Sequence, residues 1–294
     1  MEVISLGQNY SKPIVMCLGF FDCMHVGHVQ LLDCAKKLAG SNAEVALFTF
    51  SNNHFETLQR PTKLIYTFSE RLSLYESLGV DVVVSAEFDD KFRVATGAEF
   101  LAQIAKFNLS GVVCGEDYTC GRDLLNAASV QKFFDGIAPV EIVNLVKRGE
   151  KKVCSSAVRV LLQSGQVERA NELLSEQFFF LGNVSHGRSV GHKLGFPTIN
   201  LQIPSDKIVP CGVYCGLCHF DNETKKSIVN VGAQPTFGCD GNVVEAHLID
   251  FDGALYGKTV KIALTKFLRP IEKFESAEDL QAQVQRDLEA VNND

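Results

Sequence analysis

Two histidines, His25 and His28, lie three positions apart in the stretch GFFDCMHVGHVQLL, residues 19–32. Imidazoles donate hydrogen bonds to phosphoryl oxygens, so a pair at this spacing could stabilise a crowded phosphorus centre during group transfer. Taken alone, the H-x-G-H pattern is weak evidence, because surface or helix-capping histidines fit it equally well. What the pair does therefore depends on the elements that position it.

The flanking sequence places the pair where a strand gives way to a helix. Residues 14–21 form a continuous apolar run, typical of a strand buried on both faces. Apolar residues then recur at helical spacing over 26–38, and residues 43–50 form another apolar run. A helix amino terminus presents unpaired N–H groups and the positive end of the helix dipole. We therefore expect a phosphate-binding turn here.

A second polar group, Thr198 and Asn200, ends the segment GRSVGHKLGFPTIN. Their alternate positions put two side-chain oxygens on one side of an extended segment, and such hard ligands suit Mg²⁺ bound to ATP phosphates. The competing interpretation is a long hairpin loop. The segment also carries residues that oppose regular structure and let the backbone approach a nucleotide closely: Gly187, Gly191, Gly195 and Pro197.

The chain divides into two halves of different texture. Up to about residue 150, strand-like runs alternate with helical patterns, which predicts a doubly wound parallel sheet. Beyond residue 178, short strands follow one another without helices, which predicts an antiparallel barrel or sandwich. The end is helical, with a Ser276–Asp279 cap. We expect an α/β domain over 1–177 and a mostly β domain, with its carboxy-terminal helix, over 178–294.

Composition limits the possible partners. The chain has 294 residues, is 46% hydrophobic and carries a formal charge of -7, which argues against broad nucleic-acid affinity. No membrane-spanning run or signal-peptide core is apparent. Ten cysteines include the C-x3-C-x2-C cluster of Cys211, Cys215 and Cys218, but strand alternation separates the last two, which opposes a metal site. We expect reduced thiols, a cytoplasmic protein without membrane or nucleic-acid partners, and a monomer or weak homo-oligomer.

Several segments together resemble one enzyme family. GFFDCMHVGH is similar to the nucleotidylyltransferase signature, and GEDYTCGRD and CSSAVRVLLQSGQVERANELL resemble later motifs of bacterial FAD synthetase. HGRSVGHKLGFPTINL, GVY, NVGAQPTF and VEAHLIDF are similar to riboflavin kinase motifs. In order and over nearly the whole chain, they resemble the bifunctional riboflavin kinase/FMN adenylyltransferases. The resemblance implies that ATP phosphorylates riboflavin with Mg²⁺, and that FMN and ATP then form FAD and pyrophosphate.

The resemblance also implies roles for individual residues. His25 and His28 would be catalytic in the first domain, and Glu245 would be the general base of the kinase, although an outward-facing strand carboxylate is the alternative. Thr198 and Asn200 would hold the metal. Nucleotide binding is implied for Gly19, Phe20, Asp22, Gly27, Ser155, Ser156, Arg159, Gly187, Gly191, Gly195 and Pro197, and substrate binding for Asn53, His54, Asp117, Arg122 and Arg269.

Three departures from the family pattern keep two other hypotheses open. Cys23 stands where the family has glycine, Ala157 where it has threonine, and SNNHF (residues 51–55) lacks two flanking prolines. A positive φ at Cys23 would strain the loop and slow the first-domain reaction. In one alternative, the chain is a kinase whose first domain is a weak or inactive flavin- or nucleotide-binding regulatory module. In the other, that domain transfers nucleotide to a different phosphate ester.

Overall fold

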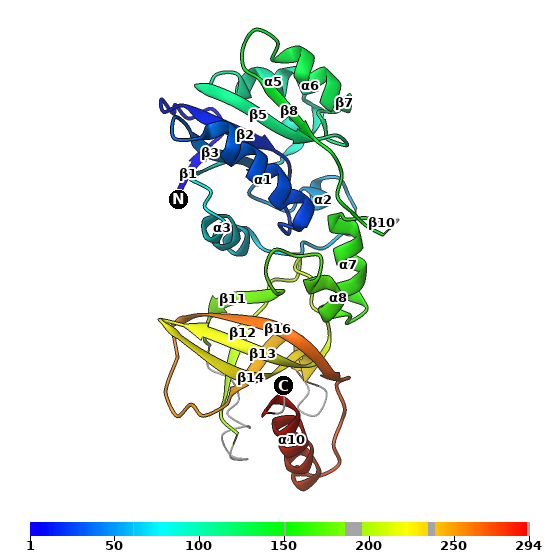
Figure 1. The fold of residues 1–294 in the computed structure, drawn as a ribbon. Helices are drawn as coiled ribbons and strands as arrows, with labels where there is room; N and C mark the ends of the chain where they lie inside the picture. The colour runs from blue at the N-terminus through cyan, green and yellow to red at the C-terminus, as the bar shows by residue number, and fades with distance from the viewer. Residues whose placement is uncertain (61, 150, 186–195, 235–238, 293–294) are drawn as a thin grey trace. The chain divides into compact units, whose positions relative to one another are not determined.

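The computed structural model describes residues 1–60, 62–149, 151–185, 196–234 and 239–292. They belong to two compact units, Met1–Ser155 and Ser156–Asp294, and most of their elements are labelled in Figure 1. The expected domain boundary, between residues 177 and 178, falls later than the boundary between these units and stays a prediction. Helix α7 (Ser155–Gln163) begins at the last residue of the first unit, and α8 (Val167–Asn171) lies between the two positions.

The first unit is built on a six-stranded parallel sheet with the order β1-β4-β3-β2-β5-β8. Every residue of its central strand β2 is buried, as the apolar run predicts. The strands are β1 (Glu2–Ser5), β2 (Ile14–Leu18), β3 (Glu44–Phe50), β4 (Val82–Ala86), β5 (Leu109–Gly115) and β8 (Val140–Val143).

Helices cover both faces of this sheet. On one face, Cys17 Sγ of β2 lies 3.8 Å from the Leu31 carbonyl of α1. On the other, Met16 and Leu18 share an apolar cluster with Phe100 of α5 and Val130 of α6. The predicted doubly wound sheet is confirmed. The helices are α1 (Val26–Ala39), α2 (His54–Thr57), α3 (Phe68–Ser77), α4 (Asp90–Val94), α5 (Gly97–Ile104) and α6 (Ala127–Phe133), and the short hairpin strands are β6 (Thr119–Cys120), β7 (Leu125–Asn126), β9 (Lys147–Arg148) and β10 (Lys151–Lys152).

The strand order fixes where this unit holds a ligand. The chain runs outward from β2 through β3 to β4, then crosses to β5 and β8 on the other side of β2. In open α/β sheets, ligands bind beyond the carboxyl ends of the strands where the winding direction reverses. Here that place lies between the loops after β2 and β5, so the histidine pair follows the correct strand.

The second unit is a six-stranded antiparallel sheet with the order β11-β16-β13-β14-β15-β12. A bridge between Ser185 and Asn200 links the chain after β11 to β12 and nearly closes the sheet into a barrel. This decides between the barrel and sandwich alternatives in favour of the barrel. The strands are β11 (Phe179–Asn183), β12 (Thr198–Gln202), β13 (Gly212–Phe220), β14 (Glu223–Gln234), β15 (Cys239–Leu248) and β16 (Thr259–Arg269).

The carboxy-terminal helix α10 (Ala277–Asn292) packs against the outer face of this sheet, beside β14 (Figure 1). Ser276 Oγ accepts a hydrogen bond from Asp279 N at 3.1 Å, as the predicted cap requires. Val291, Val284 and Leu288 of the helix meet an apolar patch on β13 and β14, formed by Val213, Cys215 and Ile228. The amphipathic pattern therefore docks the helix onto the barrel.

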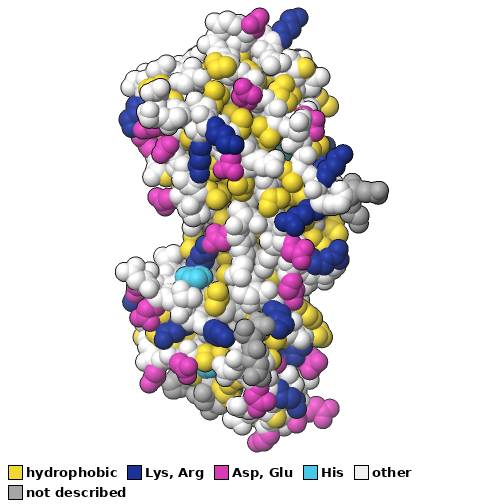
Figure 2. Space-filling model, viewed as in Figure 1, with side chains coloured by type: hydrophobic (Ala, Val, Ile, Leu, Met, Phe, Trp, Pro, Cys, Tyr) yellow, Lys and Arg dark blue, Asp and Glu magenta, His cyan; other side chains and the backbone are white. Residues whose placement is uncertain are grey.

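On the face of the molecule shown in Figure 2, basic side chains lie among acidic ones rather than gathering into one area. In the described part of the chain, no helix has the length and apolar character needed to cross a lipid bilayer. Within the same residues, no group of three His, Cys, Asp or Glu side chains could hold a metal ion.

Candidate active sites

His25 and His28 form a preorganised pair at the start of α1. His25 is the N-cap residue, with extended backbone (φ −68°, ψ 165°), and its Nδ1 accepts a hydrogen bond from the backbone N of His28 at 3.2 Å. The two rings stack with their centroids 3.6 Å apart and their planes at 17°. The helix amino terminus therefore fixes both imidazoles, as the sequence predicts.

Both imidazoles are neutral near pH 7. Burial lowers the pKa of His25 to about 4, and burial together with His25 lowers the pKa of His28 well below its ordinary value. Because Nδ1 of His25 accepts a hydrogen bond, its ring proton sits on Nε2. Nδ1 of His28 is buried without a hydrogen-bond partner among the described residues. This ring nitrogen is thus not used by the described residues, and it can hydrogen-bond to a bound molecule.

A cavity of about 730 Å³ opens beside the histidines, within the size range of small-molecule and cofactor sites. Its lining includes the carboxyl ends of four parallel strands, at Leu18, Phe50, Gly115 and Val143. It therefore lies at the topological reversal point that the strand order indicates.

One wall of this cavity is aromatic. The ring centroid of Phe50 lies 4.9 Å from that of Phe88 and 5.1 Å from that of Phe92, and His54 packs edge-on against Phe20 at 4.2 Å. All five side chains line the cavity. Rings arranged in this way offer faces and edges against which a flat aromatic ligand can pack. The sequence did not single out Phe88 and Phe92, because nothing local shows that the residues after β4 reach the cavity.

The loop that carries Phe20 is held by a buried arginine that the sequence also did not single out. Thr49 Oγ1 donates to the Phe20 carbonyl at 2.7 Å, and Arg71 donates to Thr49 Oγ1 and to the Phe50 carbonyl, both at 2.8 Å. The Arg71 guanidinium also lies over the Phe20 ring, 4.9 Å from its centroid. Arg71 is fully buried, so it positions the loop rather than touching a ligand.

Charged side chains lie close to the histidine pair. Lys152 forms an ion pair with Asp117, and both residues line the cavity. The Lys152 charge is one of the causes that lower the pKa of His25, so it acts directly on that imidazole. Arg122 lines the same cavity. Lys152 lies in the charged stretch KRGEKK, where sequence alone does not distinguish it from its neighbours.

Some of the predicted first-domain residues line the cavity and others do not. Asp22 and Asn53 are not among the lining residues. Asp22 accepts a hydrogen bond from Ile65 N at 3.3 Å, and Asn53 caps α2 by accepting one from Phe55 N at 3.2 Å. Ser156 and Arg159 belong to the second unit, and their roles stay predictions. The residues that do line the cavity are Gly19, Phe20, His25, Gly27, His28, His54, Asp117, Arg122 and Ser155.

The expected strain at Cys23 is absent. The loop's positive φ angles occur at Phe21 (51°) and Met24 (40°) and not at Cys23. The Cys23 side chain is buried, and its Sγ lies 3.6 Å from Ser155 Oγ. The condition for strain, a positive φ at Cys23, is therefore not met, because the residues on either side make the bend and the thiol fills a packed position.

In the second unit, Thr198, Asn200 and Glu245 lie together on the outer face of the barrel. Glu245 of β15 is directly opposite Asn200 of β12, and Thr198 Oγ1 donates a hydrogen bond to Glu245 Oε1 at 2.5 Å. No hydrogen bond occupies the carboxamide of Asn200 within the described residues. The hydroxyl, amide and carboxylate oxygens form the donor set that a hard cation such as Mg²⁺ prefers.

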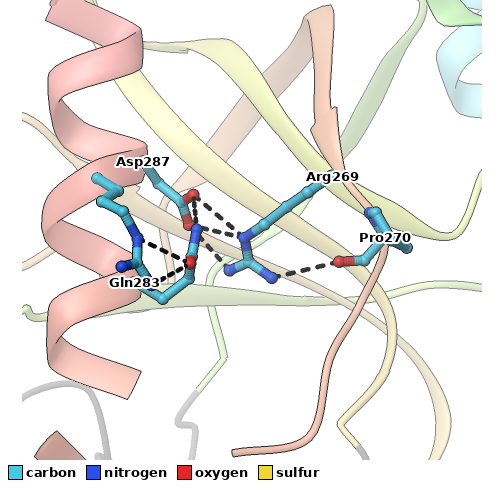
Figure 3. A network of polar contacts seen from close by, with 5 residues as sticks. Arg269, Pro270, Gln283 and Asp287 are labelled. Atoms are coloured by element: carbon cyan, nitrogen blue, oxygen red, sulfur yellow. Dashed lines mark hydrogen bonds and ion pairs between the residues drawn. The ribbon is translucent and has the colours of Figure 1, made fainter. Parts of the chain in front are cut away.

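Arg269 ends β16 on the side of the barrel that α10 covers. Its Nε and Nη2 donate to the Asp287 carboxylate at 3.1 and 2.8 Å, and its Nη1 donates to the Pro270 carbonyl at 3.2 Å (Figure 3). Gln283 Nε2 donates to the same carboxylate at 2.9 Å. The sequence suggested Arg269 as a flavin-binding residue, and the structure shows how α10 fixes its guanidinium.

The remaining predicted residues belong to the part of the sequence that precedes β12. Gly187, Gly191 and Gly195 lie outside the described residues. Pro197 is exposed, and its carbonyl accepts a hydrogen bond from Nδ1 of His247 at 2.8 Å. His247 therefore supports the chain just before Thr198.

Comparison with known proteins covers both units. The FAD synthetase family model matches residues 7–157, and the riboflavin kinase model matches residues 174–293. The bifunctional riboflavin kinase/FMN adenylyltransferase of Bacillus subtilis (strain 168) is 32% identical over 283 residues, which span 93% of this chain and 90% of that protein. The chain belongs to the family of bifunctional riboflavin kinase/FMN adenylyltransferases.

Other relatives agree with this assignment. The family member from Listeria monocytogenes serovar 1/2a is 30% identical over 281 residues, with 93% of this chain and 90% of that protein covered. A crystal structure titled macrolide-efflux protein from Streptococcus pneumoniae is 28% identical, with a TM-score of 0.87 and coverage of 100% of this chain and 99% of that one. It shares the fold over the whole chain. This chain therefore contains both domains of the bifunctional riboflavin kinase/FMN adenylyltransferase family.

Proposed function

We propose that the cavity of the first unit joins FMN to ATP and that the outer face of the barrel phosphorylates riboflavin. The chain is a transferase that makes FMN from riboflavin and FAD from FMN. One observation supports the site assignment: the motif residues gather in two places. The histidine pair lies beside a cavity of the first unit, and Thr198, Asn200 and Glu245 lie together on the barrel. Both family domains are present, which disfavours the two hypotheses in which the first domain has another role.

In the kinase reaction, Glu245 accepts the proton of the terminal ribityl hydroxyl as its oxygen attacks the γ-phosphorus of ATP. The bond from that phosphorus to the β-phosphate oxygen breaks, so that ADP leaves and FMN forms. Thr198 and Asn200 would hold Mg²⁺ beside Glu245. The cation would neutralise phosphate charge in the transition state. The Thr198–Glu245 hydrogen bond keeps the base on the same side of the barrel as this cation site.

In the second reaction, an FMN phosphate oxygen attacks the α-phosphorus of a second ATP, and the bond to the β-phosphate breaks to release pyrophosphate. Two neutral imidazoles at a helix amino terminus donate hydrogen bonds to the crowded phosphorus centre, with no proton removed from substrate. Lys152 and Arg122 add positive charge, and Lys152 exchanges its partner Asp117 for phosphate. The aromatic wall takes the isoalloxazine ring. Riboflavin, FMN, FAD, ATP and Mg²⁺ are the proposed partners.

Product analysis tests both assignments. With riboflavin, ATP and Mg²⁺, the chain should yield FMN and then FAD. Glu245→Gln keeps the size of the side chain and removes the base, so FMN formation should fall by about 10²- to 10⁴-fold while FAD formation from supplied FMN persists. Kinase turnover within a few-fold of the parent would show that Glu245 is only a strand carboxylate.

A further inference from the structure

Asn230 lies next to the proposed base on the outer face of the barrel. In the register of the sheet, Asn230 of β14 is directly opposite Glu245 of β15, which is itself opposite Asn200 of β12. Residues directly opposite in antiparallel strands point to the same face, with Cβ atoms about 4.5–5.5 Å apart. Asn200, Glu245 and Asn230 therefore form one polar row across three strands.

The Asn230 carboxamide is available for a ligand. The side chain is partly exposed, and none of the described residues forms a hydrogen bond with it. Most amides in such a setting pair with the protein or with a ligand, since an amide offers two donors and an acceptor.

The polar row changes to apolar surface immediately beyond Asn230. Its neighbour on the other side is Val213 of β13, which is buried under α10 together with Ile228. Gly232, two residues further along β14, has φ 128°, and a Cβ there would lie 3.0 Å from Ile271 Cδ1. The absence of a side chain at Gly232 thus brings the segment after Arg269 close to this end of β14.

A polar row that is followed by an apolar area matches the chemistry of one class of substrate, a polyol chain attached to an apolar ring. When the terminal hydroxyl of riboflavin lies at Glu245, the vicinal 4′-hydroxyl oxygen lies about 3 Å away along the chain, toward the ring. A carboxamide one strand from Glu245 is at hydrogen-bonding range of that hydroxyl. The isoalloxazine ring then continues toward the apolar side, where α10 and Arg269 lie.

We propose that Asn230 binds the ribityl 4′-hydroxyl of riboflavin and so places the 5′-hydroxyl against Glu245. This inference rests on the proposed kinase site. It makes Asn230 a substrate-binding residue that selects flavins with an intact polyol chain, because a site built to pair a hydroxyl discriminates against substrates that lack it.

The experiment pairs a protein change with a substrate change. The full-length parent and Asn230→Ala are each assayed with riboflavin and with a 4′-deoxy analogue that keeps its 5′-hydroxyl, at saturating ATP and Mg²⁺. We expect Asn230→Ala to lower kcat/KM for riboflavin by about 2- to 10-fold, chiefly through KM, the effect of one lost neutral hydrogen bond. The analogue should lose a similar factor with the parent and almost nothing further with Asn230→Ala. Asn230→Ser, which keeps a hydroxyl, should recover part of the loss.

Controls separate the possible outcomes. Glu223→Ala, on the same strand but exposed and remote from the site, should behave as the parent, and FAD formation from FMN reports on folding of every variant. Equal losses for riboflavin and analogue in Asn230→Ala would overturn the inference. So would a raised KM for MgATP instead of riboflavin, which would make Asn230 a nucleotide or metal ligand. If the parent itself makes no FMN, it is the proposed function that fails.

Discussion

At the scale of the residue, His28 provides the sharpest test of the first site. We expect His28→Ala to reduce FAD formation from FMN by about 10²- to 10³-fold, because it removes a preoriented donor to the reacting phosphate. Riboflavin phosphorylation by the same molecules should be nearly unchanged, since its residues lie in the other unit. A folded variant that loses both activities equally would contradict the assignment of two sites.

His25 should make the folded state sensitive to acid. Its pKa is about 4 in the folded chain and about 6.5 when unfolded. Between these values the unfolded chain binds more protons, so stability falls as pH decreases from 6.5 to 4, by at most about 3 kcal/mol. Asn at an N-cap accepts the same backbone hydrogen bond, so His25→Asn keeps the cap and removes the titration.

Thermal unfolding of the parent and His25→Asn across this pH range measures the effect. The melting temperature of the parent should fall more steeply on acidification, while the two proteins should differ little in slope above pH 7. Parallel curves over the whole range would show that His25 does not titrate between these values.

Sequence identified the residues that do chemistry through their type but missed several that act through position. The histidine pair, Thr198 and Asn200 could be found because spacing or alternation places them on one turn or one side of a strand, whereas Glu245 was found through the family resemblance. Lys152 is an ordinary residue by sequence, and Asn230 begins the quoted motif NVGAQPTF but was given no role of its own. Loop packing brings Lys152 to a site, and strand register brings Asn230 to one. Asn53 shows the reverse, since a polar residue beside a cavity is used to cap a helix.

At the scale of the element, α10 is attached to the barrel by its apolar face and by the Arg269–Asp287 ion pair, whose side chains are 15% and 5% exposed. Asp287→Asn leaves the guanidinium without a countercharge, so we expect the second unit to lose about 1–3 kcal/mol of stability. The KM for riboflavin should also rise if Arg269 binds flavin.

Urea unfolding and kinase kinetics on the same preparations check this expectation. Glu289→Gln is the matched control, because it removes the charge of an exposed side chain on the same helix. It should leave the stability and the KM for riboflavin unchanged. Equal behaviour of the two variants would make the ion pair an energetically minor surface contact.

The helices and strands were predictable where periodicity was strong. The predicted strands over residues 14–21 and 43–50 and the carboxy-terminal helix are all found, because buried runs and amphipathic faces carry a local signal. The edge strand β1 (Glu2–Ser5) was not expected, since three of its four residues are exposed. β12 was hidden in a segment rich in glycine, and only its pairing with β15 makes it a strand. The local sequence pattern does not show that β1 pairs with β4 or that β12 pairs with β15.

At the scale of the whole molecule, the barrel should depend on α8 for its stability. Asn171 donates to the Leu264 carbonyl at 2.9 Å and accepts from Phe178 N at 2.8 Å, and Glu168 accepts from Phe267 N at 2.9 Å. Removing α8 loses these hydrogen bonds together with the packing of the helix on β16. We expect a piece covering 156–294 to be about 2–4 kcal/mol more stable than one covering 178–294.

Denaturant titration of the two pieces measures this difference in stability, and FMN formation reports whether each piece is native. Equal stability would place the energetic boundary after α8, at the position expected from sequence. Failure of both pieces to fold would mean that the barrel requires the first unit.

The position of β12 in the barrel has a consequence for heat inactivation. Thr198 and Asn200 lie on this strand, which is paired along its length only with β15 and is joined on its other side by the bridge to Ser185 within the described residues. A terminal strand held in this way opens with less free energy than the whole domain requires. Each opening would move Thr198 and Asn200 away from Glu245, which stays in the sheet on β15. Kinase turnover should therefore decline several degrees below the unfolding of the barrel, with fast amide exchange confined to β12, and riboflavin with MgATP should raise the temperature of that decline.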